Sequence, residues 1–455
     1  MGKATATAKT PLFCQSKLLC FSLLYLFTTL LLAFHHKISP NKCFFRSSPF
    51  DPIQSPLFHY PPSYGEHKHA IPTHRNSCSS PVLFSDYGKV AEEIHNLCKS
   101  TSAFLPALRY LQGKAETFGG NFSFNERISY FNDSNNDSYV PCGFLKEFPV
   151  SDSDRIAMES CNGVVVASAI FNDHDKIRQP IGLGPKTPEI ACFFMFIDDI
   201  TLQGLYYHKL IPQNSPDYNK VGVWRIVKVF SEKLYKNPAM NGVIPKYLVH
   251  RLFPNSKFSI WIDAKLQLTV DPLLLIHSLV ISKDDDMAMS KHPYYIHTME
   301  EAMATARWRK WSDMDGLTRQ METYCENGLQ PWTPDKHPYT TDVPDSALIL
   351  RKHGRRSNLF SCLTFNELEG FNPRDQLGFA FVRDKMNPKL KLNMFEAQVF
   401  EQIVVEYRHN LKNFGNIMAG SEGVVGPKRA SHGHLFLNDS RCRNYLLTMW
   451  GESHS

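Results

Sequence analysis

A run of five uncharged residues, Phe258-Ser-Ile-Trp-Ile, leads directly into Asp263. Such a run, rich in Ile and aromatic residues and bounded by polar ones, is typical of a strand buried on both faces of a parallel sheet. The pair Asp271-Pro272 follows and is a helix start signal. Sheets of this kind bind ligands at the carboxyl ends of their strands, so Asp263 is a candidate for contacting a metal ion or a polar substrate. The alternative is that Asp263 only caps the turn after the strand.

Similar apolar runs recur along the chain and alternate with stretches of helical spacing. Strands are predicted over residues 163–171, 190–197 and 221–229, and shorter ones begin at residues 287 and 346. Helical spacing occurs over residues 85–111, 241–253 and 298–326. Strands that alternate with helices predict an α/β fold, in which a mixed, mostly parallel sheet is covered by helices on both faces.

The N-terminal part predicts a membrane anchor. Residues 18–34 contain no charged residue and are rich in Leu and Phe, while Lys3, Lys9 and Lys17 precede them without an acid. This length is at the short end for a helical span. The basic flank predicts a cytosolic tail at residues 1–17 and a lumenal body. A cleaved signal peptide is the alternative, but no Ala-x-Ala site follows the run. We therefore expect an uncleaved type II signal anchor.

The composition fits a folded body behind this anchor. Hydrophobic residues make up 43% of the chain and aromatic residues 12%, which excludes a mainly disordered protein. The net charge of +6 is small for 455 residues and no Lys/Arg run is present, so we expect no nucleic-acid partner. No Gly-x-Ser-x-Gly, His-Glu-x-x-His or Walker-type motif occurs. Common serine hydrolases, zincins and P-loop enzymes are therefore disfavoured.

The sequence also predicts segment boundaries, disulfides and glycosylation sites. Residues 35–140 are expected to form a stem and a glycosylatable loop, residues 141–420 the catalytic domain, and residues 421–455 a tail. Nine of the eleven cysteines follow the anchor, so an oxidising lumen should pair several and leave at least one unpaired. Asn-x-Ser glycosylation sequons occur at Asn121, Asn132, Asn136 and Asn438.

Polar side chains follow several predicted strands and should gather at one rim of the sheet. Asp263 and His292 are candidate metal ligands, because acids with a histidine can hold a hard divalent cation that grips a diphosphate. Asp375 opens a predicted helix and is a candidate general base for an acceptor hydroxyl. The alternative for Asp375 is a helix-start acid, and for the others ordinary solvated strand ends. The candidates for binding the phosphates or the metal of a donor are Arg225, Lys246, Arg251, Lys265 and Asp199.

Six motifs stand in order over about residues 140–415. They read Asn172-Asp-His-Asp-Lys-Ile-Arg-Gln-Pro, Trp224-Arg-Ile-Val, Pro245-Lys-Tyr-Leu-Val-His-Arg-Leu-Phe-Pro-Asn, Ser259-Ile-Trp-Ile-Asp-Ala-Lys, Ser290-Lys-His-Pro and Arg374-Asp-Gln-Leu-Gly-Phe. Together they resemble the plant family of the turgor-regulation-defect protein and the mucilage-related probable hexosyltransferase. The short stem resembles the turgor-regulation-defect branch more closely.

The resemblance implies a GT-A-like, Rossmann-like glycosyltransferase domain in a Golgi type II membrane protein. Such an enzyme would move a sugar from a nucleotide-sugar to a cell-wall polysaccharide or other glycan acceptor. Asp263 would contact the donor diphosphate directly or through Mn²⁺ or Mg²⁺. Enzymes of this kind usually carry Asp-x-Asp, whereas this chain reads Asp263-Ala-Lys265. Either Lys265 supplies part of the charge of the metal, or Asp199 is the missing ligand.

Two other functions stay open. The same family carries an alkaline ceramidase label, and a ceramidase needs an activated water and an apolar channel. In that case Asp263, His292 and His250 are the candidates to activate water through a metal. The third hypothesis is a non-catalytic scaffold that binds other Golgi glycosyltransferases, which the imperfect Asp-x-Asp favours.

Overall fold

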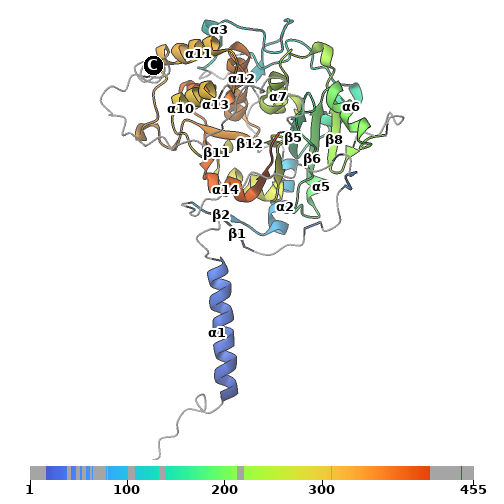
Figure 1. Cartoon of the computed structure of the whole chain (residues 1–455), viewed down its shortest axis with the longest axis vertical. Helices are drawn as coiled ribbons and strands as arrows, with labels where there is room; N and C mark the ends of the chain where they lie inside the picture. The colour runs from blue at the N-terminus through green and yellow to red at the C-terminus, as the bar shows by residue number, and fades with distance from the viewer. Residues whose placement is uncertain are drawn as a thin grey trace, which may run out of the picture.

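The computed structural model describes residues 17–37, 43–47, 52–53, 58–61, 64, 78, 80–100, 108–132, 139–212, 220–308, 310–409 and 442. Most of them form one α/β body, and helix α1 (Lys17–Lys37) stands apart from it (Figure 1).

An eight-stranded mixed sheet forms the centre of the body, in the order β13-β11-β12-β9-β5-β6-β8-β7. Neighbours among β9, β5, β6 and β8 are parallel, as are β11 and β13, whereas β12 is antiparallel to both β9 and β11 and β7 is antiparallel to β8. The expected mixed, mostly parallel sheet is therefore confirmed. The strands are β5 (Val164–Ile170), β6 (Ala191–Ile197), β7 (Lys220–Val221), β8 (Trp224–Lys228), β9 (Phe258–Ile262), β11 (Met287–Lys291), β12 (Pro344–Lys352) and β13 (Leu392–Phe395).

Helices cover both faces of this sheet. Along β5, Val164 and Val166 join one apolar layer while Val165 and Ala167 join the other, because successive side chains of a strand point to opposite faces. One layer holds α7 (Pro238–Tyr247), α8 (Val249–Leu252), α10 (Thr298–Arg307), α11 (Met314–Glu326), α12 (Arg355–Gly370) and α13 (Asp375–Lys385). The other layer holds α2 (Tyr87–Lys99), α6 (Asp199–Tyr207), α9 (Pro272–Leu279) and α14 (Ala397–Ile403).

Three smaller sheets and several short helices complete the described part. The sheets pair β1 (Phe44–Arg46) with β2 (Val82–Phe84), β3 (Arg109–Tyr110) with β4 (Tyr139–Val140), and β10 (Leu266–Leu268) with β14 (Val404–Glu406). The short helices are α3 (Phe124–Ser129), α4 (Asp152–Glu159), α5 (Thr187–Ile190), η2 (Ser231–Lys233), η3 (Ile281–Lys283) and η4 (Pro334–Lys336).

Helix starts and breaks follow local signals. The Asp271 side chain accepts the backbone N–H of Leu273 and caps α9, as the Asp-Pro pair predicts. The helical stretch expected over residues 298–326 is two helices, because Asp313 caps a new helix by accepting from the N–H of Gly316. The stretch expected over residues 241–253 is likewise divided, since α7 ends before Leu248.

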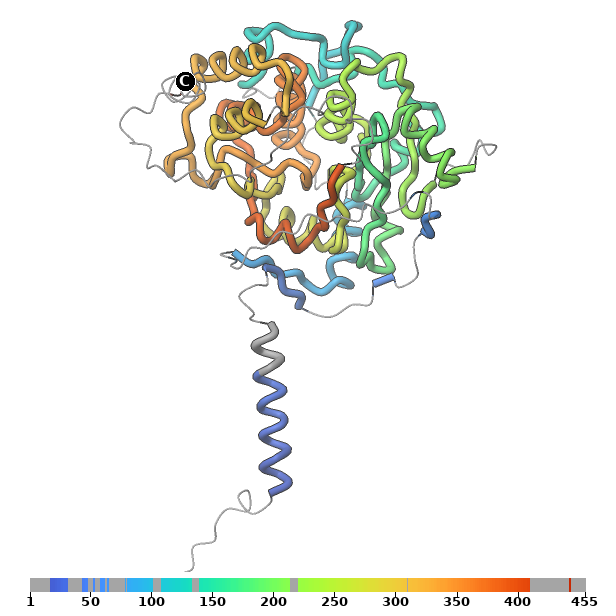
Figure 2. Tube along the Cα trace, in the orientation of Figure 1, coloured from blue at the N-terminus to red at the C-terminus, as the bar shows by residue number. Residues whose placement is uncertain are grey.

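Part of the predicted stem packs on the body. The N–H of Cys43 donates to Oε1 of Gln402 in α14 at 2.9 Å, and Tyr64 is buried. Accordingly, the blue N-terminal strands and the orange-red α14 lie at the same end of the body (Figure 2). Four disulfides join the described cysteines, and Cys98 is the unpaired one among those that follow α1. The expectation of several pairs and one leftover is thus confirmed. The pairs are Cys43–Cys78, Cys142–Cys362, Cys161–Cys192 and Cys325–Cys442.

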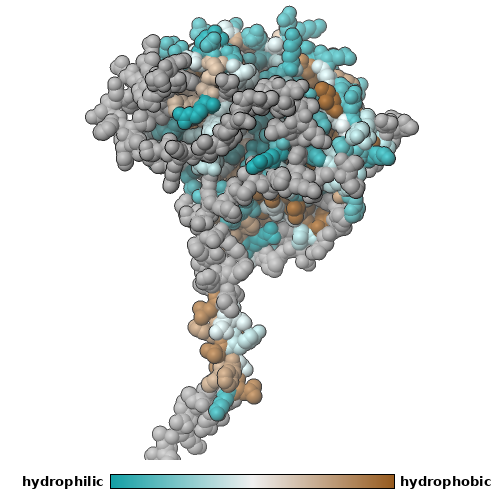
Figure 3. All heavy atoms as spheres, viewed as in Figure 1, coloured by the Kyte–Doolittle hydropathy of each residue, from teal (hydrophilic) through white to brown (hydrophobic). Residues whose placement is uncertain are grey.

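The N-terminal helix coincides with the predicted anchor. Helix α1 includes all of residues 18–34, and Leu18, Phe21 and Tyr25 are 70–80% exposed. Figure 3 shows such apolar side chains along the rod below the body. Within the described residues, however, no helix combines the length and the apolar character that a membrane crossing requires. The anchor expected at residues 18–34 is therefore not confirmed.

Candidate functional site

The carboxyl end of β9 delivers Asp263 to the rim of the sheet. Its backbone N–H donates to the carbonyl oxygen of Ala347 at 2.8 Å, which fixes Asp263 beside the first residues of β12. The indole N–H of Trp261 donates to Oδ1 of Asp263 at 2.7 Å. The Asp263 side chain is 31% exposed, so it is buried enough to be oriented and open enough to meet a ligand.

Lys246 joins two of the predicted site acids. Its Nζ lies 2.8 Å from Oδ2 of Asp375 and 3.4 Å from Oδ1 of Asp263. The three residues come from α7, the end of β9 and the start of α13, so the sheet and two helices of one layer meet here. The sequence predicted a functional role for each of the three, and the structure brings them together.

Asp375 is held from three sides. Ser346 donates to Oδ1 at 2.8 Å, and Tyr247 donates to Oδ2 at 3.0 Å. Burial by itself would raise the pKa of Asp375, but the charge and hydrogen bond of Lys246 hold it below its ordinary value. Burial would likewise lower the pKa of Lys246, yet Asp263 and Asp375 raise it. The pair is therefore ionised at neutral pH.

Lys265 lies in a second group of charges beside Asp263. Its Nζ is 2.8 Å from Oε1 of Glu406, which the antiparallel pairing of β10 with β14 places there. Burial disfavours the charged amine, but Glu406, Asp263 and Asp345 raise the pKa of Lys265 above its ordinary value. Burial raises the pKa of Asp345. Lys265 is thus a half-buried ammonium among carboxylates, in the place where an Asp-x-Asp motif would have its second acid.

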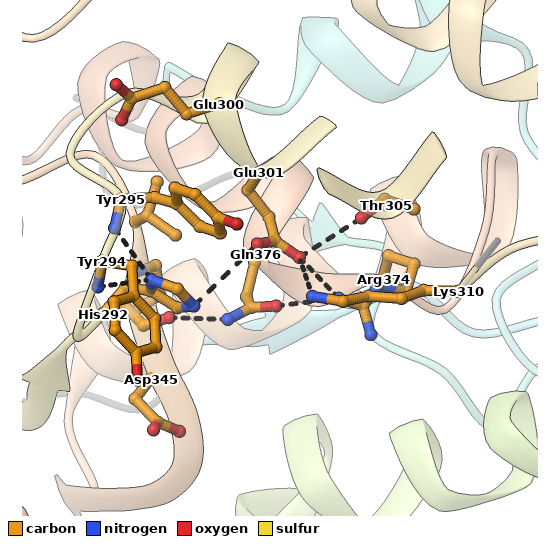
Figure 4. Close-up of polar contacts among 12 residues, drawn as sticks. His292, Tyr294, Tyr295, Glu300, Glu301, Thr305, Lys310, Asp345, Arg374 and Gln376 are labelled. Carbon is orange, nitrogen blue, oxygen red and sulfur yellow. Dashed lines mark hydrogen bonds and ion pairs between the residues drawn. The ribbon is translucent and has the colours of Figure 1, made fainter. Parts of the chain in front are cut away.

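His292, after β11, belongs to a separate network (Figure 4). Its Nδ1 accepts the backbone N–H groups of Tyr294 and Tyr295, its ring stacks on that of Tyr295 at 4.7 Å, and its Nε2 lies 3.9 Å from Oε2 of Glu301. Arg374 ties Glu301 to the start of α13 with a 2.6 Å contact. Both ring nitrogens of His292 therefore face groups of this network rather than Asp263.

Three predicted donor-binding residues contact other partners. Asp199 pairs with Lys228 at 2.6 Å, and the hydrogen bond from Lys228 lowers the pKa of Asp199. Arg225 donates to Asp154 from two nitrogens. Arg251 donates to the carbonyl oxygen of Cys142, and burial lowers its pKa. None of these contacts involves the cluster of Lys246, Asp263 and Asp375.

His250, a candidate for activating water under the ceramidase hypothesis, is buried against a disulfide. Its Nε2 lies 3.3 Å from Sγ of Cys142 and 3.5 Å from Sγ of Cys362, which are bonded to each other. Burial holds its pKa well below the ordinary value. Within the described residues, these three form the one group of at least three His, Cys, Asp or Glu ligand atoms that lie within 4.8 Å of one another.

The fit of a divalent cation rests on Asp263. Within the described residues, the side-chain contacts of this carboxylate go to Oδ1, so Oδ2 is the oxygen that would bind a cation. One or two carboxylates together with substrate phosphates are the usual ligands of Mg²⁺, and Asp263 fits that role. His292 does not complete such a site, given the network that holds its ring.

Two of the predicted glycosylation sites are exposed at the surface, namely Asn121 and Asn132. The other two, Asn136 and Asn438, lie outside the described residues.

Several members of the site were not predicted from sequence. Ser346 and Tyr247 complete the hydrogen bonds of Asp375, and Trp261 orients Asp263. Glu406, which lies 141 residues later in the sequence, balances the charge of Lys265. A weak signal existed for Ser346 and Asp345, because they open a strand on the same rim. Only the fold shows that Ser346 donates to Asp375 and that Asp345 lies near Lys265.

The fold and the rim define a class: an enzyme-like α/β domain with buried, paired charges at the carboxyl edge of its sheet. The chain belongs to the family described as "TOD1/MUCI70, glycosyltransferase-like domain", whose model matches residues 108–409. That range includes every residue of the rim described above.

The chain is similar to two proteins from Arabidopsis thaliana. The chain is 62% identical to "Alkaline ceramidase TOD1" over 99% of its own length and 100% of the relative. It is 34% identical to "Probable hexosyltransferase MUCI70" over 77% of its own length and 62% of the relative. Among solved structures, mouse xyloside xylosyltransferase 1 matches 51% of this chain and 84% of that chain with a TM-score of 0.28 and 7% identity.

Proposed function

We propose that the protein is a glycosyltransferase that moves a hexose from a nucleotide-sugar to a glycan acceptor such as a cell-wall polysaccharide. The observation that carries this proposal is Lys246 held between Asp263 and Asp375 at the rim. Membership of a family with a glycosyltransferase-like domain supports it, as does the name of the hexosyltransferase relative.

The donor would lie against Asp263 and Lys246. The ammonium of Lys246 balances charge on the diphosphate leaving group, which stabilises a transition state whose negative charge grows there. Asp263 would contact the donor directly or hold Mn²⁺ or Mg²⁺, and such a cation would supply Lewis-acid stabilisation of the same diphosphate. Lys265 adds a second fixed positive charge beside Asp263.

Asp375 is proposed as a positioning residue for Lys246. Its Oδ1 accepts from Ser346, its Oδ2 faces Lys246 and Tyr247, and its side chain is only 12% exposed, so an acceptor hydroxyl would reach it only if these side chains shifted. The general-base role expected from the sequence would require that rearrangement. Loss of Asp375 should therefore weaken donor binding rather than act on the acceptor alone.

The test is nucleotide release from a panel of nucleotide-sugars with a glycan acceptor. Asp263→Asn should abolish turnover, while Asp199→Asn is the matched control, because Asp199 is another rim carboxylate whose partner is Lys228. Asp375→Asn should raise the KM for the donor. Equal turnover in wild type and Asp263→Asn would contradict the proposal.

A ceramide amidohydrolase is the second candidate, favoured by the 62% identity to the relative named as an alkaline ceramidase. Asp263 is the rim carboxylate that such a reaction would use, since His250 is enclosed against a disulfide. Release of fatty acid from ceramide by wild type, lost in Asp263→Asn, would decide for it. Absence of both activities, with no nucleotide-sugar bound, would favour a scaffold for other Golgi glycosyltransferases.

We also propose a Golgi location with the body in the lumen. Support comes from the apolar run at residues 18–34 behind a basic tail and from eight paired cysteines, which an oxidising compartment favours. Protease protection of the body in intact Golgi vesicles, lost on adding detergent, is the expected result. Cleavage in intact vesicles would contradict it.

A further inference from the structure

Arg351 is a fully buried arginine near the end of β12. Its exposed fraction is 0%, and it lies on the same face of β12 as Ile349, toward α7. Its Nε, Nη1 and Nη2 atoms make no hydrogen bond within the described part of the chain. The guanidinium carbon lies 5.6 Å from the centroid of the Tyr247 ring. A buried guanidinium without hydrogen bonds is costly, so Arg351 calls for a partner that the described residues do not supply.

Other unsatisfied polar atoms surround the same position. Ser259 is the Cα partner of Arg351 across the β9–β12 pair, so the two side chains share one face. The buried hydroxyl of Ser259 has no hydrogen-bond partner among the described residues. His353 donates Nδ1–H to the carbonyl oxygen of Ser256 at 2.8 Å, and the described residues supply no donor to its buried Nε2 lone pair. The charge of Arg351 acts on the rings of both His353 and His250. Several buried polar atoms around Arg351 thus lack hydrogen-bond partners among the described residues.

Within the same residues, no carboxylate lies in hydrogen-bond contact with Arg351. Burial lowers its pKa to about 10, so the guanidinium is still cationic at neutral pH. Asp375 is the carboxylate whose charge reaches it, but Lys246, Ser346 and Tyr247 already hold that group. Water could satisfy the hydrogen bonds of a buried polar site. Water cannot balance its charge, whereas an anion does both.

We propose that Arg351 and Ser259 bind one buried monovalent anion of the chloride type. Guanidinium N–H and hydroxyl O–H groups donate to the anion, and the remaining N–H groups of Arg351 reach the Nε2 lone pair of His353 through water. This anion site does not depend on which reaction the protein performs, so its failure would leave the proposed function unaffected.

The experiment measures the melting temperature of the full-length protein in chloride and in isethionate at equal ionic strength. A ligand that binds only the folded state stabilises it, so chloride and bromide should each raise the melting temperature by about 3 °C. Arg351→Met should remove the rise. Arg356→Met is the control and should keep it, because Arg356 pairs with Asp286 at 2.6 Å instead.

A crystallographic measurement covers the case in which Arg351→Met does not fold. Wild-type crystals grown in bromide should show an anomalous peak within hydrogen-bond distance of the Arg351 guanidinium, and Ser259→Ala should show a weaker one. Equal melting temperatures in chloride and isethionate, or only water beside Arg351 in bromide, would overturn the proposal.

Discussion

Replacing Lys246 by methionine removes the charge between Asp263 and Asp375 and fills most of the same volume. The Lys246 and Asp375 side chains are only 10% and 12% exposed, so the substitution leaves a buried carboxylate without its cation. Removing one partner of a buried pair costs about 3–5 kcal/mol of unfolding free energy. The control is Lys228→Met. The pair of Lys228 with Asp199 is 37% and 42% exposed, and such pairs contribute less than about 1 kcal/mol.

The cost of Lys246→Met should depend on pH. In the wild type the pKa of Asp375 is lowered, so its ion pair stabilises the fold above about pH 4, the ordinary Asp range, and this contribution is lost as the pH falls through the folded pKa. In the variant, burial is opposed by the hydrogen bond of Ser346 and the charge of Arg374 but no longer by Lys246, so the pKa of Asp375 rises. The folded variant then binds a proton more readily than the unfolded chain, and the stability difference should be largest near pH 7.5 and smaller at pH 5.

The assay is urea unfolding at pH 5 and pH 7.5 with the disulfides intact, followed by circular dichroism. Equal costs for Lys246→Met and Lys228→Met, or a Lys246→Met cost that does not change between the two pH values, would refute the reasoning.

Two further predictions concern stability. The Cys142–Cys362 disulfide closes a sequence separation of 220 residues, whereas Cys161–Cys192 closes 31. Loss of the first should therefore lower the free energy of unfolding by about 1.7 kcal/mol more than loss of the second. The difference in unfolding midpoint between the two double-serine variants measures this cost. Asp271→Ala removes three hydrogen bonds from a buried cap and should lower the unfolding free energy by about 2 kcal/mol or more. Asp271→Asn should retain part of that stability. Unchanged stability in the alanine variant would contradict the role of the cap.

The sequence predicted the central strands well because their signal is local. Continuous apolar runs located β5, β6, β8 and β9, and polar residues marked their ends. The antiparallel direction of β12 was not predicted, because strand direction depends on how distant segments pair. The split of residues 298–326 has a local cause in the Asp313 cap, which a search for helix start signals could have found.

The site was only half predictable. Residue type and position identified Asp263, Lys246 and Asp375, but contacts between β9, α7 and α13 decide that one lysine bridges both acids. Arg225 and Arg251 look equally suitable in sequence, and they instead bind Asp154 and a backbone carbonyl. A basic side chain near a strand end therefore predicts a charge contact without predicting its partner.

The most direct test of the central claim is a calorimetric titration of the full-length protein with nucleotide-sugars, with and without Mn²⁺. The account predicts saturable binding by wild type and by Asp199→Asn, and no binding by Asp263→Asn. Failure of wild type to bind any nucleotide-sugar under either condition, or equal binding by Asp263→Asn, would contradict it.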